Sequence, residues 1–186
     1  MAFLRKRPAA RAAALLCAAA LLRVGPALAA PTAHQVEAVF LFYFTQFVEW
    51  PPEAFTDRHS PIVIGVLGED PFGAALDQAV AGERVNGRRV LVRRLQGMGD
   101  AMDCQILYIG ASEAPQLPQI LSALKGHGIL TVSALDHFAR RGGMIRFVLV
   151  HRRVRLRINA QAARDAGLKL SSKLLSAAAP AAPGES

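Results

Sequence analysis

The feature that most constrains the fold is a series of short apolar runs, each separated from the next by a stretch with helical signals. The run over residues 61–67 is rich in β-branched residues, as buried parallel strands are. Similar runs occupy residues 104–109 and 128–132, and Asp70-Pro71 before residues 72–81 is a typical helix start. This alternation predicts an α/β fold: a single three-layer domain with a mostly parallel sheet flanked by helices.

Polar residues mark further turns and caps along the chain. Asn86-Gly87 predicts a turn before a strand over residues 88–95. Ser112 is placed to cap a helix that ends near residue 126, and Ser133 is placed to cap a short helix. These assignments rest on local patterns alone.

The C-terminal part of the domain has the pattern of a hairpin followed by a helix. Residues 144–150 and 153–158 are two strand-like runs joined by His151-Arg152. Asn159 is placed to cap a helix over residues 160–166. The sequence therefore predicts a C-terminal antiparallel hairpin at the edge of the sheet.

The first helix of the domain is apolar on almost all sides. Thr32 can cap a helix from about residue 33 to residue 49, and Pro51-Pro52 ends it. Apolar residues recur at three- and four-residue steps, but Leu41 and Phe42 fall outside that stripe. Such a helix is either deeply buried or shared with a partner, and both interpretations stay open.

Residues 1–29 have the three zones of a secretory signal peptide. A basic start precedes an apolar Ala-Leu run, and Pro26-Ala27-Leu28-Ala29 offers the small-x-small pattern of a cleavage site. Cleavage near Ala29 leaves a domain over residues 30–176 and a flexible tail over residues 177–186. The protein is therefore expected to be exported.

Removal of this peptide lowers the net charge of the chain. The whole chain has 22 Lys and Arg against 14 Asp and Glu, a formal net charge of +8. Five basic residues lie in the signal peptide, so the remaining chain has 17 basic and 14 acidic residues and a net charge of +3. This value is too small for a general nucleic-acid binder, and no nucleic-acid partner is expected.

The sequence contains no recognisable catalytic constellation. Gly65, Gly68 and Gly73 follow the first strand, but their spacing matches neither the dinucleotide fingerprint nor the P-loop. The five histidines lack metal-ligand spacing. Burial and a neighbouring carboxylate would raise the pKa of Cys104, which disfavours a nucleophilic role. We expect no enzyme, no cofactor and no metal.

Two basic features are candidates for binding. Arg140-Arg141-Gly142-Gly143 places two guanidinium groups, which can grip a carboxylate or a phosphate, beside a flexible turn. A plain surface turn is the other interpretation. The strand over residues 153–158 alternates arginine with aliphatic residues, so its arginines share one face: Arg153, Arg155 and Arg157. That face is either a solvated face that protects a sheet edge or a basic stripe that faces an acidic partner.

Four motifs in order resemble the YfiR family: residues 39–51 (VFLFYFTQFVEWP), 61–73 (PIVIGVLGEDPFG), 138–145 (FARRGGMI) and 159–175, which ends in LSSKLL. The resemblance extends from about Val36 to Leu175. It implies a dimeric periplasmic repressor that holds an inner-membrane diguanylate cyclase, YfiN or a similar protein, inactive through its periplasmic sensor domain. Repression lowers cyclic di-GMP and biofilm formation. Related domains also occur in other membrane signalling proteins such as histidine kinases.

The motifs and the basic turn together give the candidate residues for a partner or ligand site: Phe47, Trp50, Arg140, Arg141, Gly142, Gly143, Ser172 and Lys173. The apolar first helix would supply association energy, and the two arginines would supply orientation. The alternative is a periplasmic sensor module not tied to a cyclase, whose small ligand is read by Arg141 and the glycine turn. The founding member responds to redox state through cysteine pairs, which the single Cys104 left after cleavage cannot form.

Overall fold

The computed structural model describes residues 30–178 of the chain. The chain divides into two units, Met1–Ala30 and Pro31–Ser186, and the description below concerns the second. The predicted signal peptide, and the predicted tail from residue 179 onward, lie outside the described residues. No helix among the described residues is long and apolar enough to cross a membrane.

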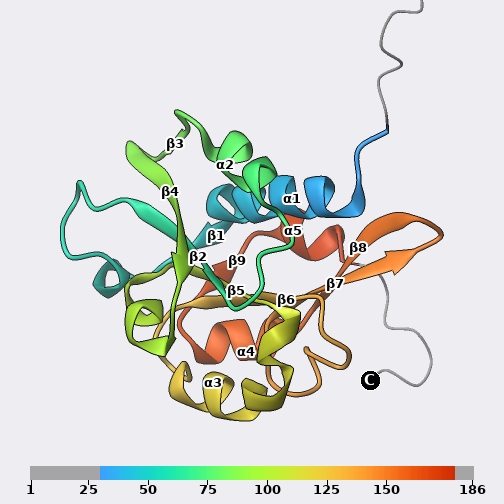
Figure 1. The fold of residues 1–186 in the computed structure, drawn as a ribbon. Helices are drawn as coiled ribbons and strands as arrows, with labels where there is room; N and C mark the ends of the chain where they lie inside the picture. The colour runs from blue at the N-terminus through green and yellow to red at the C-terminus, as the bar shows by residue number, and fades with distance from the viewer. Residues whose placement is uncertain (1–29, 179–186) are drawn as a thin grey trace, which may run out of the picture. The chain divides into compact units, whose positions relative to one another are not determined.

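The centre of the domain is a seven-stranded mixed sheet in the order β3-β4-β2-β5-β6-β7-β8 (Figure 1). Five neighbouring strands run parallel: β4 (Arg88–Leu95), β2 (Ile62–Leu67), β5 (Ile106–Ile109), β6 (Leu130–Ser133) and β7 (Ile145–Val150). At the two edges, β3 (Arg84–Val85) is antiparallel to β4, and β8 (Arg153–Ile158) is antiparallel to β7. The predicted mostly parallel sheet with a C-terminal hairpin is confirmed.

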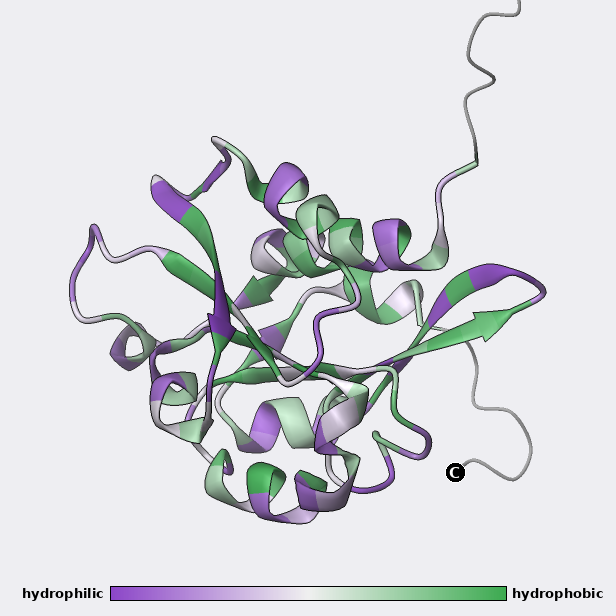
Figure 2. Ribbon diagram, viewed as in Figure 1, coloured by the Kyte–Doolittle hydropathy of each residue, from purple (hydrophilic) through white to green (hydrophobic). Residues whose placement is uncertain are grey.

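Helices cover both faces of this sheet. One face is covered by α1 (Ala33–Phe47), α2 (Ala74–Val80) and α5 (Ser172–Ser176). The other face is covered by α3 (Leu117–Ala123) and the 3-10 helix η2 (Met98–Asp103), and the 3-10 helix η3 (Ala111–Gln116) precedes α3. Adjacent strand residues point to opposite faces, so each face has its own buried cluster, and Figure 2 shows apolar colouring along the central strands and α1. The three-layer prediction is confirmed.

The start of α1 follows its local sequence signals closely. Thr32 Oγ1 accepts from the Gln35 amide at 3.3 Å, and Gln35 Oε1 accepts from the Thr32 amide at 2.8 Å, which completes a capping box. The helix ends at Phe47 rather than Glu49, because β1 (Val48–Glu49) pairs antiparallel with β9 (Lys169–Leu170). This small second sheet joins the beginning of the domain to its end.

The other turn signals and the last cap are confirmed. Asn86 and Gly87 have φ values of 51° and 82°, and His151 and Arg152 have φ values of 48° and 62°, as tight hairpin turns require. Asn159 Oδ1 accepts from the Ala162 amide at 3.0 Å and caps α4 (Ala160–Asp165). Each of these features depends on residues close together in sequence.

The predicted start of α2 is two residues early. Asp70 Oδ1 accepts from the amides of Phe72 and Gly73 at 2.7 and 3.3 Å, so Asp70 stabilises the turn before the helix. The helix itself begins at Ala74.

Two predicted helix caps are wrong. Ser112 lies inside η3, where its hydroxyl accepts from the Glu69 amide at 2.9 Å, and the α-helix begins only after this turn. Ser133 is the last residue of β6, and its hydroxyl donates to the Ile109 carbonyl at 2.7 Å. Residues 136–142 then form turns rather than a helix. Both hydroxyls are held by neighbouring loops and strands instead of a helix terminus.

Candidate functional site

In parallel α/β sheets, ligands bind beyond the carboxyl ends of the strands, where the strand order reverses. Here β4 and β5 lie on opposite sides of β2, so that place lies between the loops after β2 and β5. The two loops contact each other through the bond from Glu69 to Ser112, and a Cβ added at Gly110 would overlap the Glu69 carbonyl. The two loops therefore meet at this point, and a pocket of about 220 Å³ lies beside them at the ends of β5 and β6.

Cys104 is a packing residue in the face covered by α3. Its side chain is 2% exposed, and Gly65 lies inside β2 where a Cβ would come within 2.7 Å of the Cys104 sulfur. Burial raises the pKa of the thiol to about 11, so it is protonated at neutral pH. Gly65 therefore makes room for this sulfur, and within residues 30–178 no group of three or more His, Cys, Asp or Glu could hold a metal.

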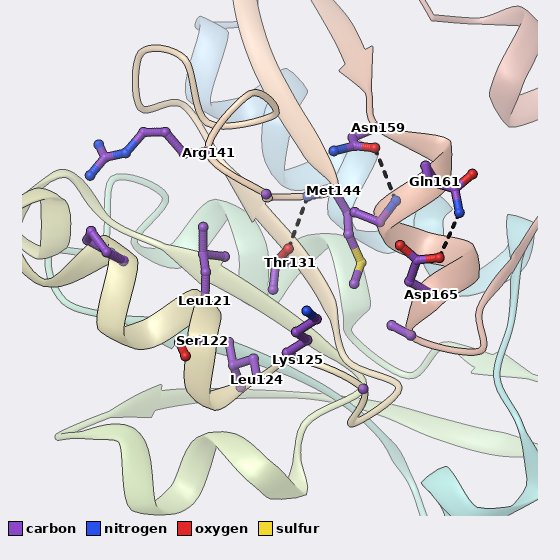
Figure 3. Close-up of a pocket in the computed structure, with 15 residues that line it drawn as sticks. Leu121, Ser122, Leu124, Lys125, Thr131, Arg141, Met144, Asn159, Gln161 and Asp165 are labelled. Carbon is purple, nitrogen blue, oxygen red and sulfur yellow. Dashed lines mark hydrogen bonds between the residues drawn. The ribbon is translucent and has the colours of Figure 1, made fainter.

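A pocket of about 480 Å³ opens between α3 and α4 (Figure 3). Its apolar lining comes from the two helices, the residues that directly follow them and the residue before β7: Pro118, Leu121, Leu124, Met144, Ala162 and Ala166. Its polar lining comes from Thr131 on the sheet and from side chains at the rim: Lys125, Arg141, Asn159, Gln161 and Asp165. The volume is in the range typical of small-molecule sites.

The rim of the pocket carries two unpaired cations. Gln161 Nε2 donates to Asp165 Oδ1 at 2.7 Å, which occupies one oxygen of the only rim carboxylate. Lys125 and Arg141 have no ion-pair partner among residues 30–178. Figure 3 shows the Arg141 guanidinium directed away from Met144, whereas Lys125 lies over the apolar floor. Lys125 is therefore the unpaired cation that lies beside the apolar lining.

The four residues of the predicted glycine-arginine turn do not lie in one site. Arg141 and Gly142 line the pocket, whereas Arg140 is exposed beside β7 and β8. Gly143 is buried, and a Cβ at this position would overlap the ring of Phe138, which is fully buried. Gly143 therefore makes room for an aromatic ring.

The other candidate residues lie near the end of α1 and on α5. The amide of Ser171 donates to the carbonyl of Phe47 at 2.9 Å and connects the start of α5 to the end of α1. Phe47 and Trp50 are half-buried, and Ser172 and Lys173 are exposed on α5. The structure therefore places Phe47 next to the start of α5, whereas Trp50 lies against Gln105.

Trp50 is held by a buried glutamine. Its Nε1 donates to the Gln105 carbonyl at 3.0 Å. The Gln105 side chain, in a residue 6% exposed, accepts from the Val63 amide at 2.8 Å and donates to the Ala54 carbonyl, at the end of η1 (Pro52–Ala54), at 2.7 Å. Sequence reasoning missed Gln105, because a lone glutamine before a strand belongs to no motif.

The apolar helix α1 is buried on one side and exposed on the other, so burial is confirmed for one side only. Leu41 and Phe44 are fully buried against the sheet. On the outer side, Val39 is 41% exposed and Tyr43 is 44% exposed. An apolar strip of α1 is thus open to solvent in the single chain.

The alternation predicted for β8 is confirmed. Arg153 and Arg155 are exposed, Arg157 is half-buried, and Leu156 on the opposite face is buried. A basic face therefore lies on one side of the β7–β8 hairpin.

A comparison with models of known families gives a match over residues 34–179 to the family described as YfiR/HmsC-like. None of the curated proteins compared with the chain matches it. The matched range contains every candidate residue named above.

Proposed function

The chain belongs to the YfiR/HmsC-like family, and from this premise we propose that it is an exported, non-catalytic regulator acting in the periplasm. Its partner is the periplasmic domain of an inner-membrane diguanylate cyclase similar to YfiN. Repression of that cyclase lowers cyclic di-GMP and biofilm formation. The observation that carries this proposal is the family match over nearly the whole domain. The contact between the loops after β2 and β5, and the protonated, buried Cys104, support a role without catalysis.

The mechanism of this proposal is binding to one conformation of the partner. A regulator that binds the inactive cyclase more tightly than the active cyclase shifts the population toward the inactive form. The exposed apolar strip of α1, which includes Val39 and Tyr43, supplies the association surface for the partner or for a second copy in a homodimer.

Deletion and complementation test the function directly. Deletion of the gene is expected to raise the cyclic di-GMP concentration. The full chain supplied on a plasmid is expected to lower it again to the wild-type level. A chain that lacks residues 1–29 should leave the cyclic di-GMP concentration high, because the regulator then stays in the cytoplasm. Unchanged cyclic di-GMP after deletion would show that the cyclase assignment is wrong.

A matched pair of variants tests the role of the α1 strip. Val39→Asp places a charge on the strip, whereas Leu91→Asp places the same charge at a β4 position of equal exposure, 40% against 41%. Val39→Asp should abolish repression or dimer formation, and Leu91→Asp should preserve both. Equal behaviour of the two variants, with equal melting temperatures, would remove the strip from the interface.

The pocket between α3 and α4 favours a second candidate function, that of a small-ligand sensor. Its apolar walls and the unpaired Lys125 suit a monocarboxylate with an alkyl or aryl group. A thermal-shift series with hexanoate, octanoate and phenylacetate tests this, since a ligand at about 100 times its Kd stabilises by about 2.7 kcal/mol. Stabilisation that is lost in Lys125→Ala supports the sensor function, and no stabilisation by any of the three argues against it.

A further inference from the structure

Positive charge is gathered in one segment of the domain. Residues 137–164 contain eight arginines and no acidic residue. The rest of residues 30–186 contains nine basic and fourteen acidic residues, so the remainder of the domain is net negative. The modest net charge of +3 therefore conceals a strong separation of charge.

Much of this charge lies on one face of the β7–β8 hairpin, which extends from the sheet edge in Figure 1. Residues paired across an antiparallel ladder share a face. Val148 pairs with Arg155, and Val150 pairs with Arg153, so aliphatic and guanidinium groups alternate across this surface. We call the surface formed by Arg140, Val148, Val150, Arg153 and Arg155 the arginine face.

The charge of the arginine face is not neutralised within the domain. Elsewhere, Arg94 forms ion pairs with Asp70 at 3.0 Å and with Asp77 at 2.7 Å. Arg153 and Arg155 have no acidic partner among residues 30–178. The nearby acid, Asp136, is already engaged by a half-buried arginine of β7. The exposed guanidinium groups of the face are therefore available to an outside partner.

We infer that the arginine face docks on an acidic surface of the partner protein. This inference rests on the proposed function and adds the chemistry of the surface that the regulator recognises. Arginine is enriched at protein interfaces, where its planar group pairs with carboxylates and its stem contacts apolar atoms. The valines between the arginines supply apolar contact in the same patch. Opposite charge on the partner accelerates association and selects the orientation of docking.

A second copy of this chain does not fit the arginine face. A two-fold dimer centred here would place one set of arginines against the other, and like charges in contact disfavour association. A head-to-tail contact with an acidic region of another copy would build a ring or a filament instead of a two-fold dimer.

A lipid surface fits less well than a protein. Membrane-inserting segments bury apolar residues and keep their cations at the headgroups. At this hairpin the turn residues His151 and Arg152 lie beyond Leu149 and Val150, so the charged groups would enter first. Anionic lipid is therefore the outcome that the experiment must separate from an acidic protein.

The test measures binding of the exported protein, purified from the periplasm, to the full-length cyclase in phosphatidylcholine nanodiscs. One variant is Arg153→Glu with Arg155→Glu. The control is Arg89→Glu with Arg93→Glu, which makes the same charge change at exposed positions on β4, toward the other edge of the sheet. Binding is measured at about 50 mM and about 500 mM NaCl, because screening weakens exposed charge pairs. Empty nanodiscs that contain phosphatidylglycerol measure lipid binding.

The inference predicts that the hairpin variant raises Kd by about tenfold or more at low salt, whereas the control stays within about twofold of the wild type. Equal weakening by both variants would show that only net charge matters and would overturn the inference.

Unchanged binding by the hairpin variant would also overturn the inference. If repression persists in that case, the proposed function still stands. Hairpin-dependent binding to empty phosphatidylglycerol discs alone would assign the face to lipid. If deletion leaves cyclic di-GMP unchanged, the cyclase proposal fails and this inference fails with it. Should the glutamate pair fail to fold, Arg153→Gln with Arg155→Gln makes the same comparison with half the charge change.

Discussion

Replacement of Gly143 by alanine is expected to destabilise the domain through one buried contact. A Cβ at this position would lie 2.5 Å from Cζ of Phe138 and would overlap other atoms of the same ring. Phe138 is fully buried against the face covered by α3, so the ring has little space into which it can move. The backbone also restrains the turn, because the Gly143 amide donates to the Phe138 carbonyl at 3.0 Å.

The size of the effect follows from the cost of overpacking a core. One extra methyl group in a well-packed interior costs about 1–3 kcal/mol. For a domain of this length, 1 kcal/mol shifts Tm by about 2–4 °C, so Gly143→Ala should lower Tm by about 2–12 °C. Phe138→Leu alone destabilises as well, because it shortens a buried side chain.

A double-mutant cycle separates the steric contact from a change in the backbone. In Gly143→Ala with Phe138→Leu, the smaller side chain leaves room for the new methyl group, so the pair should show a favourable coupling of about 1–2 kcal/mol. Gly142→Ala is the control, because Gly142 has a φ of +99° and no atom within 4 Å of an added Cβ. Its cost comes from the backbone alone, and Phe138→Leu should not reduce it.

Thermal and urea denaturation of the three single and two double variants measure all of these values. A Tm for Gly143→Ala within about 1 °C of the wild type would refute the reasoning, because even the smallest expected cost gives a larger shift. A coupling energy near zero would show that the destabilisation does not come from the Phe138 ring.

Three other predictions concern buried polar and titratable groups. Gln105→Ala leaves two groups without a partner, the Val63 amide and the Ala54 carbonyl, and each should lower the free energy of unfolding by about 1–3 kcal/mol. A urea titration followed by tryptophan fluorescence measures the loss. A total loss below about 1 kcal/mol would contradict this prediction. Burial raises the pKa of Glu37, so the folded protein favours the protonated carboxyl, and this stabilisation is lost as pH rises through the folded pKa. The stability gained by Glu37→Gln, which stays neutral, should therefore be larger at about pH 7 than at about pH 4. A gain independent of pH would disprove this. With a pKa of about 11, Cys104 should react with iodoacetamide at neutral pH only after unfolding in urea, and rapid labelling of the folded protein would show the thiol to be accessible.

The parts of the fold that sequence could predict depend on short-range bonds. Thr32 caps α1 through a residue three positions away, and Asn159 caps α4 in the same way. Their donors and acceptors are therefore visible in a single window of sequence. The caps assigned to Ser112 and Ser133 were wrong, because these hydroxyls bond to groups 43 and 24 residues away. A serine before a helical pattern looks the same in both situations.

The candidate site was accessible to sequence reasoning in part, for a related reason. The arginines of β8 follow from alternation within one strand. Gln105 meets Trp50 across 55 residues of sequence, and no local pattern indicates this contact. The pocket between α3 and α4 likewise needs four separated segments, which only the packing of the sheet brings together.

The pairing of β1 with β9 has a consequence for the order in which the domain is completed. The chain is made from its N-terminus, so α1 is the first element of the domain to emerge and β9 is among the last. Val48 and Glu49 cannot find their ladder partners, Leu170 and Lys169, until almost the whole domain has been synthesised. Until then the apolar side of α1 that finally packs against β8 and α5 has no partner there. The apolar side of α1 therefore stays exposed in the newly made chain until the C-terminal elements of the domain are present.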